Sequence, residues 1–380
     1  MGDFLVEISH LFRSHRKPHR DLTLDEFTMP FRGRHRARCY NPNKPERYHL
    51  KGYSLNEAST GYCLNFFMYE GRDEKRPPGV SATTWPTLKL VGRDDQLRNK
   101  GYILWADNWF SGLPAVRVCI DAGVEYAGTC RQDRLGAYST KGMTKPEKKA
   151  HQEAEKLVKK GWKRGDYRAK ETTIGGKRVY AMQWQDSNVV SFISTIKPVV
   201  GRTTRKTVDK KTRKYTLAYI TILSIYSAYN FGKVGTDRMD QMVALYYRNT
   251  KHRWHVKLFI HLAYMCLNNA HVTYNDEHPD GRLSYLEFIL AVIEELKPAP
   301  KNPRNDPNAH SRAGIHTPFH NHTQHNKKGG VKEKNRQRDY CVQCKQSRSM
   351  HSCVECGVFL HINGGKPGRT CWSEWHSKHQ

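Results

Sequence analysis

Hydrophobic and polar positions in the first part of the chain follow a strand-like pattern that runs from about residue 21 to residue 69. Residues 48–56 and 62–69 are the two runs richest in strand-forming side chains. The stretch between them, residues 57–61, consists of turn-forming residues and ends in a glycine. The pattern therefore predicts a β-hairpin in this part of the chain.

A short apolar strand is predicted at residues 101–106, and a helical pattern follows at about residues 114–122. Asp107 stands directly after the strand and before the helix. In open α/β sheets, ligands bind beyond the carboxyl ends of the strands. We therefore expect Asp107 to lie at an edge of the sheet that is open to ligands.

The middle of the chain returns to β-structure after one polar helix. Residues 145–160 lack an apolar stripe, and they predict a helix exposed to solvent. Runs at 166–173, 178–185 and 189–195, the first two joined by a Gly-Gly turn, predict an antiparallel meander. Residues 201–214 contain seven Lys or Arg and are expected to form a basic loop.

Helices are predicted in the part of the chain that follows. Residues 236–249 form the first of them, and Thr236 could cap its start. Residues 254–274 are apolar on most faces, which indicates a buried helix. Residues 284–296 begin with the Ser-x-x-Glu pattern of a capping box, so a further helix is expected there.

The charge of the chain indicates nucleic acid as a partner. Sixty-four Lys and Arg against 36 Asp and Glu give a formal net charge of +28, which is spread through the sequence. Each cation that neutralises a phosphate releases counterions and adds sequence-independent affinity. No apolar run reaches the ~18 residues of a membrane-spanning helix. We expect a nuclear protein that binds double-stranded DNA and no membrane; a merely soluble basic protein is the alternative.

The last forty residues carry half of the ten cysteines in a zinc-ligand pattern. Two Cys-x2-Cys pairs precede a mixed set of His and Cys, and eight ligands suffice for two tetrahedral Zn²⁺ ions. Because this segment has too few apolar residues to fold unaided, the zinc would be structural. A set of disulfides is the alternative, which the scattered positions of the other cysteines disfavour. The predicted ligands are Cys341, Cys344, Cys353, Cys356, His361, Cys371, His376 and His379.

Three acids have a spacing that suits metal ions. Asp237 and Asp240 are three residues apart on a predicted helix and share one face, and Asp107 ends a strand. Converging carboxylates suit Mg²⁺, which works in pairs about 4 Å apart when a phosphodiester is attacked. Spacing alone leaves an alternative open, in which Asp107 is a helix N-cap and the other two are helix-start acids favoured by the macrodipole.

Several motifs, in order along the chain, resemble those of the piggyBac transposase family. Residues 105–114, Trp-Ala-Asp-Asn-Trp-Phe-Ser-Gly-Leu-Pro, are similar to the family's second-aspartate motif. Residues 230–242, which end in Thr-Asp-Arg-Met-Asp-Gln-Met, resemble its third-aspartate motif. The resemblance extends from about residue 23 to the end of the chain. Further matches in the family's order are residues 184–195, 253–254, 283–288 and the Cys-rich end.

The resemblance implies cut-and-paste DNA transposition at TTAA sites with two Mg²⁺ ions, and a zinc domain that binds transposon ends. Water would cleave one strand, the freed 3′-hydroxyl would form a hairpin, and the strand would be transferred into target DNA. Asp107 and Asp237 would bind the metal ions, and Asp240 would assist. The first catalytic Asp of the family is matched by Glu57, which lies between a strand and a Ser-Thr-Gly-Tyr turn.

Two departures from the family affect this expectation. Glu57 is one methylene longer than Asp, and a two-metal site requires placement to within fractions of an ångström, so weak or absent cleavage is expected. The chain also begins close to the core, so the family's N-terminal dimerisation and DNA-binding helices are expected to be largely missing.

The predicted fold class is α/β, in which the family resemblance implies an RNase H-like catalytic core; a β-rich insertion, C-terminal helices and a small zinc-binding cross-brace module complete it. Residues 1–20 are expected to be a basic N-terminal remnant. The transposase domain spans residues 21–296, with the insertion at about 131–215. Residues 297–339 form a basic flexible linker to the zinc module at 340–380.

Basic side chains around the acids are predicted to contact DNA, whereas the neighbouring aromatic side chains could contact DNA or belong to the core. We also expect that the chain could form a homodimer. Two other functions stay open: a domesticated DNA-binding protein whose core is only a scaffold, and a chromatin or protein-interaction adaptor that acts through the zinc module. The predicted DNA contacts are Arg131, Arg134, Arg248, Lys251 and Arg253.

Overall fold

The computed structural model describes residues 2–71, 76–135, 142–208, 215–246 and 252–297, together with short stretches of the C-terminal part. Those stretches are residues 318–320, 339–340, 348–349, 351–353, 360, 371, 375 and 377. The chain divides into two compact units, Met1–Ile293 and Glu294–Gln380. The first unit contains the sheet and the helices that build the candidate site.

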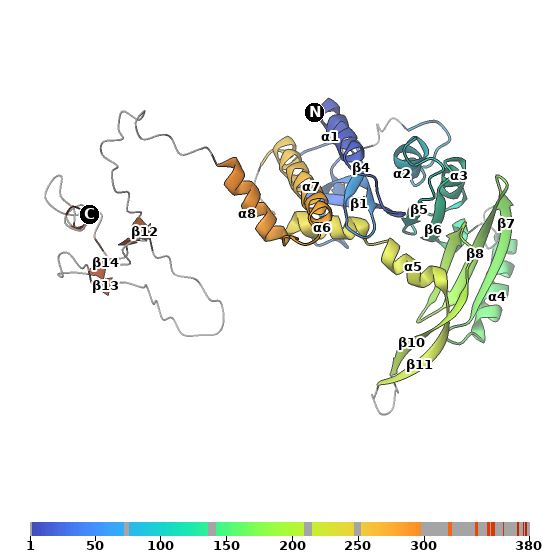
Figure 1. Cartoon of the computed structure of the whole chain (residues 1–380). Coiled ribbons are helices and arrows are strands. Elements are labelled where there is room, and N and C mark those ends of the chain that lie inside the picture. The colour runs from blue at the N-terminus through green and yellow to red at the C-terminus, as the bar shows by residue number, and fades with distance from the viewer. Residues whose placement is uncertain are drawn as a thin grey trace. The chain divides into compact units, whose positions relative to one another are not determined.

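A nine-stranded mixed sheet forms the centre of the first unit (Figure 1). Its strands are β1 (Asp21–Pro30), β2 (Cys39–Tyr40), β3 (Tyr48–Glu57), β4 (Cys63–Met68), β5 (Ile103–Ala106), β6 (Glu125–Thr129), β7 (Tyr167–Ile174), β8 (Lys177–Gln185) and β9 (Val189–Ser194). The order is β2-β3-β1-β5-β6-β9-β8-β7, and β4 also pairs with β3. β1 is antiparallel to β3 and parallel to β5, and β5 is parallel to β6. β1 is therefore a central strand, with one neighbour of each direction.

Helices pack on both faces of the sheet. One face buries Leu24, Leu55 and Leu104 under α2 (Trp85–Thr87), a π-helical turn (Leu88–Gly92) and α3 (Leu113–Asp121). On the other face, Phe27 and Met265 belong to a core shared by α1, α6 and α7. These helices span Gly2–Ser14, Gly235–Leu245 and Trp254–Glu277, respectively.

A third apolar cluster joins the last strands of the sheet to α5 (Ser224–Gly232). Tyr226 of α5 packs against Trp184 and Phe192, with ring centroids 4.5 and 4.3 Å away. The same cluster includes residues of a separate two-stranded ribbon, β10 (Val200–Val208) and β11 (Tyr215–Leu223). The residues between β6 and α5 thus extend the central sheet and add a ribbon beside it.

Most of the predicted elements are confirmed. The hairpin is β3 with β4, the short apolar strand is β5, and the meander is β7 to β9. The exposed helix is α4 (Lys145–Lys160). The last predicted helix is α8 (Tyr285–Leu296), whose capping box is formed by Ser284 and Glu287. No helix among the described residues is long and apolar enough to cross a membrane.

Three local predictions were wrong. Residues 201–208, expected in a basic loop, belong to β10, because their backbone pairs with β11 in continuous antiparallel register. Residues 2–14, for which no helix was predicted, form α1, whose Ile8 and Phe12 are buried in the core. Thr236 is not a cap, since α6 is preceded by Val234 at its N-cap.

The second unit is described only in short paired segments. β12 (Pro318–His320) pairs antiparallel with β15 (His351–Cys353), and β13 (Asp339–Tyr340) pairs with β14 (Arg348–Ser349). β12 lies inside the stretch that the sequence predicted to be a linker, so at least this part of it has regular structure.

Candidate active site

Pairing at the centre of the sheet brings two aspartates together. β1 and β5 run parallel with Leu24 opposite Ala106, so Asp25 and Asp107, the next residues along the chain, are neighbours as well. Adjacent strands lie about 4.8 Å apart, and side chains alternate between the two faces. Asp25 therefore points to the same face as Thr23, and Asp107 lies beside it where β5 ends.

Helix α6 is fixed against that same face. The hydroxyl of Thr236, in its first turn, donates a hydrogen bond of 3.1 Å to Asn56 Oδ1. The amide of Gly235 donates a second one of 3.1 Å to Thr23 Oγ1. A Cβ atom at Gly235 would lie 2.6 Å from Thr23 Oγ1, so a larger residue would push the helix away. The start of α6 is thereby held close to Asp25, which follows Thr23 by two positions.

Two further acids, Asp237 and Asp240, come from α6. Asp237 is in the first helical turn and is exposed, where the helix macrodipole favours a negative charge. Asp240 lies three residues later, and its Oδ1 atom is buried without a hydrogen-bond partner in the described part of the protein. A buried carboxylate oxygen is costly unless something compensates its charge. Asp240 therefore provides an oxygen that a proton or a cation would satisfy.

The electrostatics link these four acids into one group, here named the aspartate cluster: Asp25, Asp107, Asp237 and Asp240. Burial, followed by the charge of Asp25, raises the pKa of Asp240 to about 8. Burial, followed by the charges of Asp107 and Asp237, raises the pKa of Asp25 to about 7. Each acid thus disfavours the charge of another, which is the expected result when carboxylates share one site.

Local backbone groups orient Asp107. Its Oδ1 atom accepts hydrogen bonds from the amides of Trp109 at 2.8 Å and Phe110 at 3.4 Å. Burial raises the pKa of Asp107, and these amides and the nearby Arg134 oppose that effect. Helix α3 begins later, after Gly112, so Asp107 is not its N-cap. The amides leave Oδ2 as the oxygen with which Asp107 can bind a ligand.

The chemistry of the aspartate cluster fits a hard divalent cation. Carboxylate oxygens are the ligands that Mg²⁺ prefers, and Mg²⁺ commonly uses one or two carboxylates together with water and substrate phosphates. Within the described residues, no three His, Cys, Asp or Glu side chains are close enough to hold one ion by themselves. Ions at this site would therefore be bound by pairs of carboxylates, with the remaining positions open.

Glu57 does not join the aspartate cluster, which corrects the expectation that it supplies the first acid. Glu57 pairs with Leu22 across the strands, whereas Asp25 pairs with Ser54. Because paired residues share a face, Glu57 projects from the opposite face to Asp25. Its carboxylate is fully buried and accepts a hydrogen bond of 2.9 Å from Arg16.

The partners of Glu57 all come from its own end of the strands. They are the guanidinium of Arg16, the backbone amide of His19 at 2.5 Å, the imidazole of His19 at 2.9 Å and the hydroxyl of Thr60. Arg16 also forms an ion pair of 2.6 Å with Asp276 at the end of α7. Glu57 therefore fastens the segment after α1 to the sheet, and this is a structural role.

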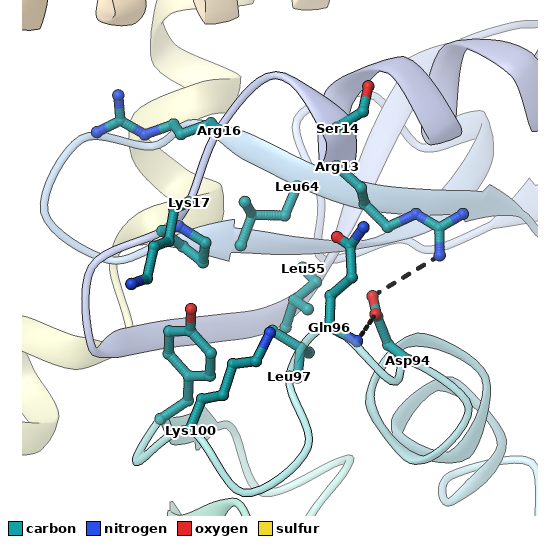
Figure 2. A pocket seen from close by; sticks show the side chains of 12 residues that line it. Arg13, Ser14, Arg16, Lys17, Leu55, Leu64, Asp94, Gln96, Leu97 and Lys100 are labelled. Atoms are coloured by element: carbon teal, nitrogen blue, oxygen red, sulfur yellow. Dashed lines mark hydrogen bonds and ion pairs between the residues drawn. The ribbon is translucent and has the colours of Figure 1, made fainter.

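A cavity of about 270 Å³ lies beside this attachment. Figure 2 shows Arg13 turned toward Asp94, with which it forms an ion pair of 3.7 Å, while Arg16 points away from the centre of the cavity. Lys17 and Lys100 also line it. The two arginines connect α1 to different parts of the first unit.

Sequence reasoning missed Asp25, although a signal was present. Aspartate is depleted in strands, yet Asp25 lies in the middle of an alternating run, Leu-Thr-Leu-Asp-Glu-Phe, at residues 22–27. An acid at an inward-facing position of such a run is unusual unless its carboxylate binds a ligand or forms an ion pair. The pattern indicated a strand-borne acid, but only the pairing register shows that it meets Asp107.

The predicted DNA contacts are only partly described. Arg134 is half-buried and donates a hydrogen bond of 2.9 Å to the carbonyl of Trp109, next to Asp107. Arg131 and Arg253 are exposed. Arg248 and Lys251 lie outside the described residues. Among the aromatic side chains, Trp105 and Phe110 are each 2% exposed and belong to the core.

The predicted zinc ligands lie almost entirely outside the described residues. Cys353 is described as part of β15 and Cys371 as helical, but the structure describes none of the other six. These six are Cys341, Cys344, Cys356, His361, His376 and His379. The zinc prediction therefore stays a prediction.

The DDE transposase family model described as Transposase IS4 matches residues 2–271, and the chain belongs to this family. The resemblance to piggyBac proteins is confirmed at the level of distant homology. The match includes both Asp25 and α1, which the sequence motifs had not identified.

Relatives and a solved structure agree with this assignment. The chain is 24% identical over 379 residues to the human "PiggyBac transposable element-derived protein 3", covering 94% of this chain and 55% of that protein. It matches the human "Chimeric ERCC6-PGBD3 protein" at the same identity, over 31% of that protein's length. The chain therefore spans about half the length of the first of these relatives, and less of the second.

The fold is similar to that of a piggyBac transposase solved by cryo-electron microscopy as a "synaptic complex with hairpin DNA". The TM-score is 0.57 at 20% sequence identity, covering 92% of this chain and 69% of that one. At this identity, the likeness shows the fold. The mixed α/β prediction is thus confirmed.

Proposed function

We propose that this chain is the catalytic part of a piggyBac-like cut-and-paste DNA transposase with an RNase H-like core. The observation that carries the proposal is the aspartate cluster, in which β1, β5 and α6 bring Asp25, Asp107, Asp237 and Asp240 to one face of the sheet. Asp25 takes the position that sequence reasoning had given to Glu57. The expected weakness of cleavage, which rested on the longer Glu57 side chain, therefore loses that support.

The cluster would hold two Mg²⁺ ions, which supply activation of the attacking water or 3′-hydroxyl and stabilisation of the leaving oxygen. Asp25 and Asp107 are adjacent and would share one ion, and Asp237 and Asp240 would complete the site from α6. Arg134 is close enough to influence Asp107, and it is suited to bind a phosphate of the substrate strand. Asp240, whose pKa is raised to about 8, would lose its proton at neutral pH most readily when a cation is bound.

The substrate we propose is double-stranded DNA that carries transposon ends and a TTAA target, processed through a hairpin as the family resemblance implies. A nuclear location and a homodimer, which would bring two ends together, belong to the same proposal. The excess of basic residues supports DNA as the partner. We further propose that residues 340–380 form a zinc module with two Zn²⁺ ions.

The test uses the purified chain, Mg²⁺, and duplex and hairpin DNA that carry TTAA. Asp25→Asn, Asp107→Asn and Asp237→Asn should each lower strand cleavage by about 10³-fold or more, because each removes about 4 kcal/mol of transition-state stabilisation. Asp95→Asn is the control, since Asp95 is exposed and pairs with Arg98. Glu57→Asp should give no gain in cleavage.

A second readout does not depend on turnover. Mg²⁺ should raise the melting temperature of the unmodified chain, because it binds the folded state, and this increase should be absent in Asp240→Asn. If the chain neither cleaves DNA nor is stabilised by Mg²⁺, the proposal is overturned. Stabilisation without cleavage would favour a metal-binding scaffold over an active transposase.

A further inference from the structure

The β10–β11 ribbon has one face anchored to the protein. Ile220 and Ile222 of β11 are buried in the third apolar cluster. Trp184 donates a hydrogen bond of 2.8 Å from its indole nitrogen to the carbonyl of Thr221. Arg205 of β10 forms an ion pair of 3.9 Å with Asp186. The ribbon therefore has a fixed inner face and cannot rotate freely.

The base of the ribbon is closed as well. The amide of Ser224 donates a hydrogen bond of 2.7 Å to the carbonyl of Val199, and the amide of Val199 donates one of 3.0 Å to the Ser224 hydroxyl. From this base the two strands pair from Val200 with Leu223 to Val208 with Tyr215. Figure 1 shows the ribbon extending from the sheet beside α5. It is a stiff arm attached at one end.

The opposite side, here named the outer ribbon face, consists of Arg202, Thr204 and Lys206 on β10 and Tyr215, Leu217 and Tyr219 on β11. These residues share a face because Thr204 pairs with Tyr219 and Lys206 pairs with Leu217. The exposed fractions of Tyr215, Leu217 and Tyr219 are 71%, 68% and 79%. Arg202, Thr204 and Lys206 are exposed too. A row of large apolar side chains in solvent next to cations is a surface that still requires a partner.

The charge of the ribbon limits what that partner can be. Residues 200–208 and 215–223 contain no Asp or Glu. Arg205 is paired with Asp186, whereas Arg202 and Lys206 have no ion pair among the described residues. A basic partner would be repelled, and an uncharged partner would offer no counter-charge to these cations. The surface is complementary to a polyanion that also offers flat apolar groups.

We infer that the outer ribbon face binds double-stranded DNA, with the ribbon lying in the major groove. A major groove about 12 Å wide admits a two-stranded β-ribbon. In that position Arg202 and Lys206 would contact phosphates, and the rings of Tyr215 and Tyr219 would contact sugars and base edges. The inference rests on the proposed function only for the nature of the substrate, and it adds a binding surface separate from the aspartate cluster.

The test measures affinity for a duplex without added Mg²⁺ and without a chelator, so that cleavage plays no part. Arg202→Ala with Lys206→Ala should weaken binding about tenfold and make the slope of log affinity against log salt shallower by about 1.8, since each phosphate contact contributes about 0.9. Lys148→Ala with Lys149→Ala removes the same charge from exposed positions on α4. That control should leave the slope nearly unchanged.

The aromatic residues give an independent readout. Tyr215→Ser with Tyr219→Ser should weaken duplex binding about fivefold without changing the salt slope, because no phosphate contact is lost. Both tyrosines are exposed, so melting temperatures should not change. Equal effects of the ribbon and α4 variants would overturn the inference, as would a greater loss on single strands than on the duplex. A loss of self-association instead of DNA affinity would assign the surface to a second copy of the chain.

These results are separable from the proposed function. Failure of the ribbon inference leaves Mg²⁺-dependent cleavage by the aspartate cluster untouched. Failure of cleavage leaves the duplex affinity measured without Mg²⁺ unchanged.

Discussion

Single buried ionisable side chains determine how the stability of this protein depends on pH and on bound cations. Burial raises the pKa of Asp25 to about 7 and that of Asp240 to about 8, so in the absence of a cation Asp25 is about half protonated and Asp240 mostly protonated at neutral pH. Because the two carboxyl groups are buried near one another, their ionised forms are disfavoured. A bound divalent cation would favour the ionised forms instead. The site is thus built to bind a cation at some expense of stability, as functional sites commonly are.

His261 allows a test of burial in the core of α7. Its ring stacks on Phe27 at 5.4 Å, and burial lowers the pKa of His261 to about 4. In the unfolded chain the pKa is about 6.5. The unfolded state therefore binds more protons between these values, and stability is lost as the pH falls from about 6.5 to about 4. At pH 5 this histidine should lower the free energy of unfolding by about 2 kcal/mol relative to pH 7.

Urea unfolding at pH 5 and pH 7 measures this effect. His261→Phe should reduce the difference between the two pH values by about 2 kcal/mol, and His261→Gln guards against overpacking by the larger ring. His278→Gln, at an exposed position after α7, is the matched control. An unchanged pH dependence in both His261 variants would contradict the buried neutral state.

At the same scale, the first acid of the site could not be chosen from the sequence. Asp25 and Glu57 both lie in strand-forming runs, and the family motif favoured Glu57 because a Ser-Thr-Gly-Tyr turn follows it. What separates them is the side of the sheet, since the register of β1 with β3 turns them to opposite faces. A register is a property of two strands, and one strand's sequence does not contain it.

Among the elements, the segment that follows α1 is attached to the sheet by one buried arginine. The side chain of Arg16 is 9% exposed, and it connects Glu57, which is fully buried, with Asp276. Arg16→Met should cost about 3 kcal/mol or more, because it leaves the Glu57 carboxylate buried without its cation. Arg20→Met, which removes an exposed pair with Asp21, should cost less than about 1 kcal/mol.

Chemical unfolding of the two variants checks this difference. Adding Glu57→Gln to Arg16→Met should recover part of the lost stability, since the uncompensated charge is then gone. A loss in Arg16→Met no larger than in Arg20→Met would show that the buried pair does not hold the segment that follows α1.

Helices and strands whose own apolar spacing is regular could be predicted from the sequence. Those that form only by pairing or packing with another segment could not. Helix α7 and the strands of the meander were evident because apolar spacing alone specifies them. β10 was not, because its Arg, Lys and Thr residues have the composition of a loop and become a strand only against β11. Helix α1 was missed because residues 1–20 were taken together as a basic segment, which concealed the apolar Ile8 and Phe12 that pack in the core.

At the scale of the whole molecule, the two units should respond differently to loss of metal. The eight predicted ligands fall within residues 341–379, in the unit Glu294–Gln380. If zinc binding supplies the folding free energy of this unit, a chelator such as EDTA should unfold it while the first unit keeps its cooperative transition.

Elemental analysis of the full chain gives the direct measurement. About two zinc ions per chain are expected from eight ligands. A single zinc ion would mean that some of these ligands are surface residues, and none would contradict the module. Cys344→Ser should lower the zinc content, whereas Cys119→Ser, in the core of the first unit, should not.

The closed base of the ribbon has a consequence for how relatives can diverge. Because Val199 and Ser224 are bonded to each other, the chain leaves and re-enters the molecule at nearly the same point. Residues can be gained or lost beyond that point at little entropic cost, and neither β9 nor α5 has to move. The length and composition of the arm are thus free to change over evolution, and if the ribbon binds DNA as inferred, its DNA preference can change without any change in the aspartate cluster.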